Sequence, residues 1–127
     1  MELQPTIQAD PLLLQIVENF IQKDMRLNIT VSINGLLIKG QAISFQDYLK
    51  ELENSFLNHV TLDLSGKAET TEEFFKSVKA SASYQRQHHI APHYLHLNQV
   101  HYLSQVDTDV PRLLRIPLMA INTFAIG

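Results

Sequence analysis

Residues 27–43 decide the fold, and they read LNITVSINGLLIKGQAI. Apolar and polar side chains alternate over 27–33, which is the period-two pattern of a half-buried strand. The Asn34-Gly35 pair that follows favours a type I′ turn, because both central residues of this turn need positive φ. A two-residue turn also fixes the register, so we expect these pairs on one shared face: Leu27 with Ala42, Ile29 with Gly40, Val31 with Ile38 and Ile33 with Leu36. Gly40 is a natural place for a bend or bulge.

A helix is predicted on each side of this hairpin. Asp10 can cap the first helix and Pro11 suits its first turn, and the apolar spacing fades near Lys23-Asp24. Ser44 can cap the second helix, with Asp47 three residues further on. The apolar face of this second helix carries Phe45, Tyr48, Leu49, Leu52 and Phe56.

Three further strands are predicted near the end of the chain. Residues 94–103 are predicted to form a strand whose side chains point alternately to two faces. We expect the face that carries Leu95, Leu97 and Leu103 to point inward. Residues 113–118 and 121–126 are extended, with a tight turn between them. Pro117 must lie at an edge, a strand end or a bulge, because proline has no amide hydrogen to donate.

The order of these elements predicts an α+β fold. We expect either a small five-stranded antiparallel sheet or an Sm-like or SH3-like barrel, with an N-terminal helix and one helix inserted after the first hairpin. The barrel is an analogy at the level of element order alone.

The stretch 58–93 is predicted to be an irregular excursion within a single domain that spans 1–127. Residues 71–79 favour a short helix, whereas 80–87 are small and polar and suggest a mobile segment. A chain of 127 residues fits one domain and can bury a core without disulfide or metal support.

Composition excludes several classes of protein. The chain is 45% hydrophobic and 18% charged, which is ordinary for a globular protein. Its net charge of −3 and its scattered Lys and Arg argue against nucleic acid as a partner, and the absence of Cys excludes a disulfide framework. No apolar run approaches the roughly 20 residues needed to cross a bilayer. The N-terminus lacks the features of a signal peptide, so we expect a cytoplasmic protein.

Five of the six histidines lie between His88 and His101. A metal site would need two or three of them to converge, and the candidates are His89, His93 and His96. On a strand, His93 and His101 point to one face and His96 to the other. Pro92 also disfavours the helix that would bring His89 and His93 together. We therefore predict no metal site and no cofactor. Because the chain has neither a Cys nor a nucleophile elbow, we predict no catalytic residue.

The sequence holds more apolar residues than the expected core needs. Leu37 and Ile43 fall on the hairpin face opposite the core set, and the C-terminal tail is very apolar. Such an excess marks interfaces, and short edge strands can pair across subunits. We therefore predict a homo-oligomer, with these candidate interface residues: Leu37, Ile43, Leu118, Ile121 and Phe124.

Three stretches together resemble the gas vesicle accessory protein U family. The first runs from Asn28 through Asn34-Gly35 to Tyr48, the second is YLHLNQV at 94–100, and the third is RIPLMAINTFAIG at 115–127. They cover about half the chain, and their order and spacing carry the resemblance; 58–93 lies outside it. The closing PLM at 117–119 is more apolar than the family pattern. The resemblance implies a small cytoplasmic, non-enzymatic protein that takes part in gas vesicle assembly or clustering, with gas vesicle proteins as partners.

Three functions follow from these observations. The first is a self-associating accessory or interaction protein of the gas vesicle type. The second is an Sm-like oligomer that binds RNA, which a positively charged channel around Arg112 and Arg115 would favour. The third is a His-dependent or metal-dependent enzyme, which a retained metal ion would favour.

Overall fold

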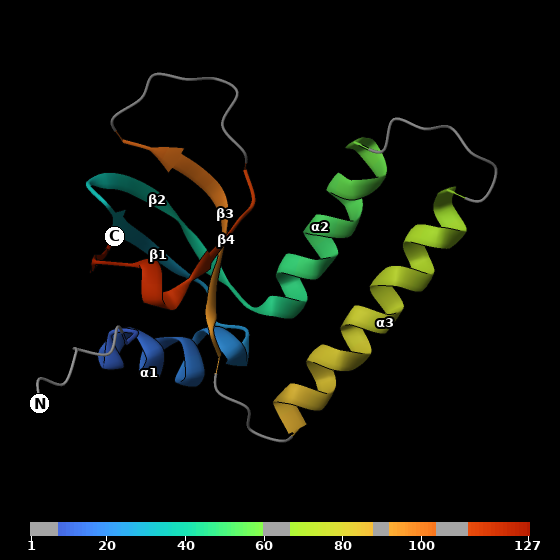
Figure 1. Cartoon of the computed structure of the whole chain (residues 1–127), viewed down its shortest axis with the longest axis horizontal. Coiled ribbons are helices and arrows are strands. Elements are labelled where there is room, and N and C mark those ends of the chain that lie inside the picture. Colours follow the sequence, from blue (N-terminus) through green and yellow to red (C-terminus); the bar gives the residue numbers. More distant parts are fainter. Residues whose placement is uncertain (1–7, 60–66, 88–91, 104–111) are drawn as a thin grey trace, which may run out of the picture.

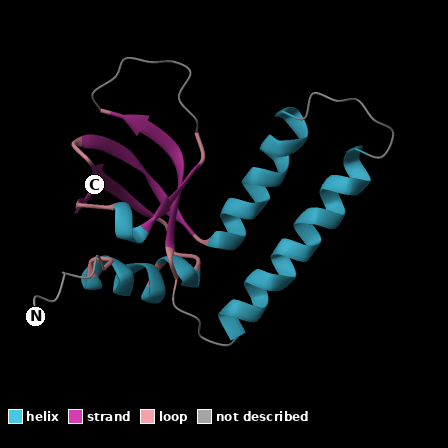
Figure 2. Ribbon diagram, viewed as in Figure 1, coloured by secondary structure: helices cyan, strands magenta, loops and turns pink. Residues whose placement is uncertain are grey.

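The computed structural model describes residues 8–59, 67–87, 92–103 and 112–127. A sheet with α1 on one face forms one part of the molecule, and two long helices project beside it (Figure 1). The strands form one sheet, with one helix against it and two long helices beside it, which confirms the predicted α+β class (Figure 2). The elements are α1 (Pro11–Asn19), η1 (Ile21–Lys23), β1 (Leu27–Ile33), β2 (Leu36–Ile43), α2 (Phe45–His59), α3 (Lys67–Gln87), β3 (Tyr94–Tyr102), β4 (Leu114–Pro117), η2 (Leu118–Ala120) and β5 (Thr123–Ile126).

The five strands form an open antiparallel sheet in the order β4-β3-β2-β1-β5. This is one of the two predicted architectures. The other, a closed barrel, is wrong, because β4 and β5 occupy opposite edges and do not pair with each other within the described residues. Each edge strand is only four residues long.

The β1–β2 hairpin has the predicted register. Leu27 pairs with Ala42, Ile29 with Gly40, Val31 with Ile38 and Ile33 with Leu36. The turn residues Asn34 and Gly35 have φ of 49° and 84°, as a type I′ turn requires.

The register between β2 and β3 shifts by one residue beside Gly40. Lys39 pairs with His101 but Gln41 pairs with Asn98, so the extra residue lies in β3, where Gln99 has φ of 51°. A Cβ atom at Gly40 would lie 3.1 Å from the carbonyl oxygen of Asn98. Glycine therefore allows the bulged strand to approach closely. The hairpin itself is regular at Gly40, which pairs with Ile29, and the bulge lies in the neighbouring strand β3.

This bulge changes which residues of β3 face the core. Leu95 and Leu97 point inward as predicted, but after Gln99 the alternation reverses, so that Val100 is buried and Leu103 is exposed. The predicted inward position of Leu103 is therefore wrong. A single inserted residue moves every following side chain to the other face.

The main core lies between α1 and one face of the sheet. Asp10 caps α1, because its carboxylate accepts hydrogen bonds from the amides of Leu12 and Leu13 at 2.8 and 3.3 Å. The helical region ends at Asp24, which has a left-handed conformation, so the predicted start and end of this region are confirmed. The buried core residues are Leu13, Val17, Ile21, Ile29, Val31, Ile38, Ala42, Leu95, Leu97, Val100, Ile116, Leu118 and Ile121.

The insertion after the hairpin contains two helices rather than one. Ser44 caps α2, because its Oγ accepts a hydrogen bond from the amide of Asp47 at 3.2 Å. The short helix predicted at 71–79 is part of the much longer α3, which also includes the segment 80–87 that was expected to be mobile. Phe75 and Ala82 are buried against Leu49 of α2 in a second apolar cluster. This packing explains why α3 extends beyond the pattern that its own sequence shows. No helix in the described part of the chain is long and apolar enough to span a bilayer.

Candidate functional site

The sheet face opposite the main core carries a compact polar and aromatic cluster beneath α2. Strand β3 turns His96 and Asn98 to this face while its leucines enter the core. The β3–β4 register pairs His96 with Arg115, which brings a cation to the same place. Phe45 and Tyr48, from the first turn of α2, cover the imidazole from above.

His96 is the most perturbed titratable group of this cluster. Its side chain is 7% exposed, and its ring centroid lies 4.9 Å from that of Phe45 and 4.6 Å from that of Tyr48. Burial, and then the charge of Arg115, lower the pKa of His96 from 6.5 to about 3. The imidazole is therefore neutral at physiological pH. Its Nε2 atom is buried and has no hydrogen-bond partner among the described residues.

Arg115 is held by aromatic rings. Its guanidinium carbon lies 3.8 Å from the centroid of the Tyr94 ring and 5.5 Å from that of Phe45, which are cation–π distances. The ion pairs found between described residues join Arg26 to Asp47 and Lys79 to Glu53, so no carboxylate there neutralises Arg115.

Asn98 ties the strand to α2. Its Nδ2 donates to both carboxylate oxygens of Glu51 at 3.2 Å, and the residue is 4% exposed. A charge-assisted bond of this kind orients α2 over the sheet.

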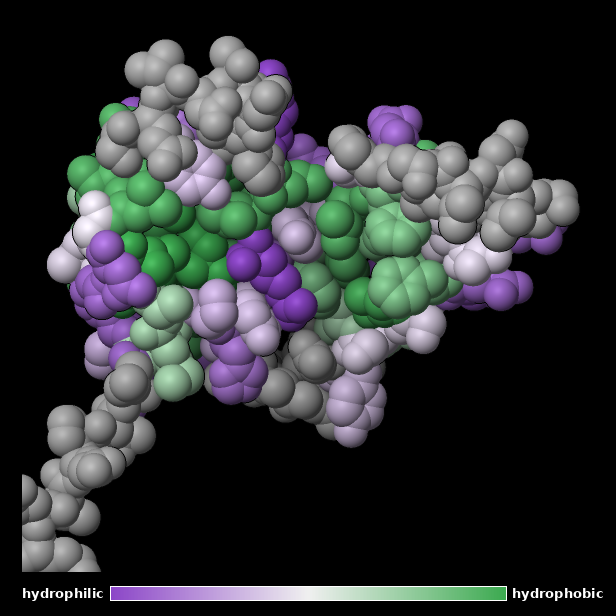
Figure 3. Space-filling view, turned by 45° about the horizontal axis from the view of Figure 1, so that its top comes forward, coloured by the Kyte–Doolittle hydropathy of each residue, from purple (hydrophilic) through white to green (hydrophobic). Residues whose placement is uncertain are grey.

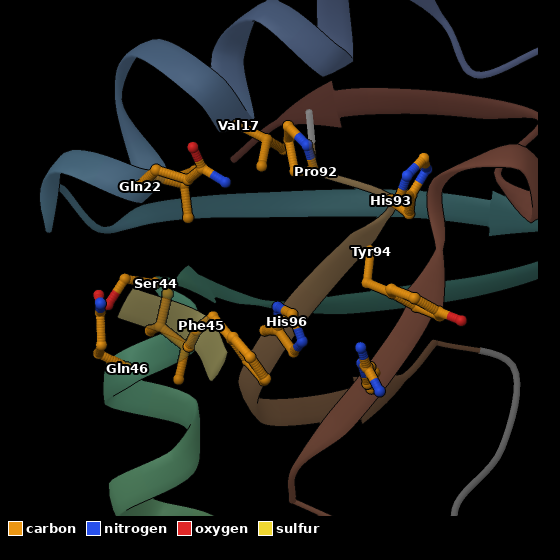
Figure 4. A pocket seen from close by; sticks show the side chains of 13 residues that line it. Val17, Gln22, Ser44, Phe45, Gln46, Pro92, His93, Tyr94 and His96 are labelled. Carbon is orange, nitrogen blue, oxygen red and sulfur yellow. The ribbon is translucent and has the colours of Figure 1, made fainter. Parts of the chain in front are cut away.

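A cavity of about 150 Å³ opens beside the cluster. Val17 of α1 and Gln22 of η1 lie on one side of it, the start of α2 lies on another, and His96 and Tyr94 of β3 lie on a third (Figure 4). A buried neutral imidazole and an aromatic-bound guanidinium can offer hydrogen bonds and positive charge to a guest. The described residues that line this cavity include no Cys and no carboxylate side chain.

The predicted histidine candidates do not form a metal centre in the described part of the chain. His89 lies outside the described residues, His93 is exposed at the cavity, and His96 is buried. The residues that the structure describes contain no group of three or more His, Cys, Asp or Glu side chains that could hold a metal ion. The bulge at Gln99 also places His101 on the same sheet face as His96, so the predicted opposition of these two is wrong.

The five candidate interface residues divide into two sets. Three of them are buried within the chain: Ile43, Leu118 and Ile121. Phe124 is partly buried against the main core, and Leu37 is exposed. Ile43 does lie on the hairpin face opposite the core set, as predicted, but the chain itself covers it.

Sequence reasoning missed a second apolar surface. The α1–β5 groove, as we call it, is a groove of about 310 Å³ lined by Ile16, Phe20, Met25, Arg26, Leu27 and Ile126. Phe20, Met25 and Ile126 are each more than half exposed. Phe20 follows the buried Leu13 and Val17 at helical spacing, which predicts a position on the same face, but α1 ends one residue earlier and the side chain turns outward. Hydrophobic surface also appears over the sheet half of the molecule and over α2 and α3 (Figure 3).

Comparisons with known proteins identify the family. The model of the family described as "Gas vesicle protein GvpU-like" matches residues 10–127. Searches of curated proteins and of solved structures gave no match. Because the match covers the three resembling stretches and both inserted helices, this chain belongs to the GvpU-like gas vesicle protein family.

Proposed function

We propose that this chain is a non-catalytic accessory protein of gas vesicle assembly or clustering, and that it acts as a homo-oligomer. Membership of a gas vesicle protein family supports the cellular role. The observation that carries self-association is the α1–β5 groove, because it combines exposed apolar side chains with a free strand edge.

The occupant that fits this groove is a second copy of the chain. Strand β5 pairs with β1 on one side and has no neighbouring strand on the other among the described residues. An edge strand offers backbone hydrogen bonds to another edge strand. Antiparallel pairing of two β5 strands about a two-fold axis would continue the sheet from one copy to the other, with the α1–β5 grooves of both copies on the same face.

The charge of the groove is consistent with this arrangement. Arg26 is its charged residue, and the guanidinium already contacts Asp47 at 3.2 Å and Gln41 at 3.2 Å within the same chain. The apolar part is therefore available to an apolar partner, whereas an acidic partner would have to compete with Asp47.

The role at gas vesicles is tested by flotation. Purified gas vesicles are mixed with the full chain and allowed to float, and the buoyant layer is assayed for the protein. We expect the chain to float with the vesicles in a saturable manner. A chain that remains entirely in the lower solution at all vesicle concentrations would contradict a direct role at the vesicle.

A pair of variants connects this assay to the groove. Ile126→Lys places a charge beside the groove, and Phe74→Lys places one on α3, where the side chain is similarly exposed, 54% against 57%. If the oligomer is the form that binds, Ile126→Lys should reduce flotation several-fold and Phe74→Lys should not. Equal loss in both variants would instead point to nonspecific adhesion of apolar surface.

A further inference from the structure

The cavity beside His96 combines features that suit an anionic guest. It lies where the end of α1 and η1, the start of α2 and the strands β3 and β4 meet (Figure 4). Its volume of about 150 Å³ resembles that of an engineered protein cavity that holds benzene. A guest of this size has a single small ring or a short branched chain.

Positive charge reaches the cavity from two directions. The guanidinium of Arg115 stands at one wall, fixed by the ring of Tyr94 and without a carboxylate partner among the described residues. The N-terminus of α2 stands at another wall, where Ser44 Oγ takes the amide of Asp47 and the preceding Phe45 and Gln46 both line the cavity. Amides in the first turn of a helix attract anions.

His96 gives independent evidence of a missing partner. Its side chain is more than nine-tenths buried, it lines the cavity, and its Nε2 has no hydrogen-bond partner in the described structure. Buried polar atoms normally have a partner, and an exception calls for an explanation. The ring is neutral, so it adds no charge to the cavity.

The remaining wall is apolar. Phe45, Pro92 and Tyr94 line it, are not fully buried, and contribute hydrocarbon surface to the cavity. A phosphate ion would leave this surface unused, whereas an anion with a hydrocarbon body would cover it.

We propose that this cavity binds a small organic carboxylate, with the carboxylate near Arg115 and the first turn of α2 and an apolar body of about benzene size against Phe45, Pro92 and Tyr94. The site is separate from the α1–β5 groove, so the proposal stands whether or not the chain acts at gas vesicles. It adds a ligand-binding activity to a chain whose family suggests none.

The test is a titration of the full chain with benzoate, followed by amide NMR and calorimetry. We expect saturable binding, with the largest shifts at Phe45, Gln46 and His96. Benzamide, which has the same shape but no charge, should bind at least about ten-fold more weakly. Absence of saturation with benzoate, equal binding of benzamide, or tighter binding of inorganic phosphate would each overturn the proposal.

Matched variants assign the anion contact. Arg115→Gln should weaken benzoate about ten-fold, whereas Arg112→Gln, which removes a nearby arginine that does not line the cavity, should leave it unchanged. If Arg115→Gln disturbs the fold, Gln46→Glu provides the second test, because an acidic residue is compatible with a helix N-terminus but repels a bound carboxylate. Its control is Gln15→Glu on the exposed side of α1. A folded Gln46→Glu protein that binds benzoate as tightly as the wild type would contradict the assigned position of the carboxylate.

Discussion

The two faces of strand β3 differ sharply in chemistry although both are buried. One face sends Leu95 and Leu97 into an aliphatic core closed by α1. The other sends His96 and Asn98 beneath α2, where the contacts are aromatic rings, a guanidinium and a carboxylate. Every atom buried in the aliphatic face adds to the free energy of unfolding. The polar face orients α2 but adds little to that free energy. The first face therefore accounts for the fold, and the second accounts for the candidate site.

The largest effect should follow truncation in the aliphatic face. Leu97 is fully buried, so Leu97→Ala should lower the free energy of unfolding by about 2–5 kcal/mol, through lost transfer energy and a residual cavity. Urea denaturation measures this change. The control, Leu37→Ala on an exposed position of β2, should alter stability by less than about 1 kcal/mol. Equal losses of stability in the two variants would contradict the assignment of Leu97 to the buried core and of Leu37 to the surface.

The polar face should make stability depend on pH. Because the folded state lowers the pKa of His96 from 6.5 to about 3, folding favours the neutral ring. The stabilisation that comes from this neutral ring is complete above pH 6.5, and it is lost progressively as the pH falls towards 3. At about 1.4 kcal/mol per pKa unit, the loss between pH 7.5 and pH 5 should be about 2 kcal/mol.

Unfolding measured across this pH range checks the sign and the residue. His96→Phe should flatten the slope between pH 7.5 and pH 5, since phenylalanine does not titrate. His101→Asn removes an exposed histidine of the same strand face and should leave the slope in place. A slope that persists in His96→Phe would show that another group is responsible.

The bulge that separates the two halves of β3 should tolerate substitution poorly. Gly40→Ala would place a methyl group 3.1 Å from the backbone oxygen of Asn98, and backbone cannot move aside as a side chain can. We expect a loss of about 1–3 kcal/mol in urea unfolding. Lys39→Ala, at the exposed neighbour, should change stability by less than about 0.5 kcal/mol. A neutral Gly40→Ala variant would mean that the strands are further apart.

The smallest effect should come from the polar face itself. Asn98→Leu removes an amide whose Oδ1 has no partner in the described structure, and Glu51, which is only partly buried, can regain water. The free energy of unfolding should therefore change by less than about 1 kcal/mol in either direction. A loss as large as that of Leu97→Ala would show that the Asn98–Glu51 contact contributes to the fold as much as the aliphatic core does.

Local signals in the sequence predicted the first face better than the second. The Asn34-Gly35 turn, the alternation of β1 and the Asp10 cap all act within a few residues, and each is confirmed. Gly40 predicted a bend or bulge at this place, but the reversal of β3 depends on a positive φ at Gln99, a residue type that rarely adopts one, so the sequence did not predict which strand carries the extra residue. The length of α3 depends on burial of Phe75 and Ala82 by a helix distant in sequence.

The candidate site was beyond local reasoning for the same reason. His96 and Arg115 meet only through the β3–β4 register, and Phe45 reaches them from α2. The periodicity of apolar residues in the sequence predicts which face of a strand a residue occupies, but it does not predict which helix or strand packs on that face. The likeness of short stretches to a family therefore proved more informative about function than any motif in the chain, and the family match over 10–127 agrees with it.

The most direct test of the proposed function is the molar mass of the full chain in solution. Light scattering over a range of protein concentrations should give values at or above twice the monomer mass of 14.5 kDa, and Ile126→Lys should return the mass towards the monomer. Phe74→Lys should keep the wild-type mass. A wild-type mass of 14.5 kDa at every concentration would contradict self-association through the α1–β5 groove.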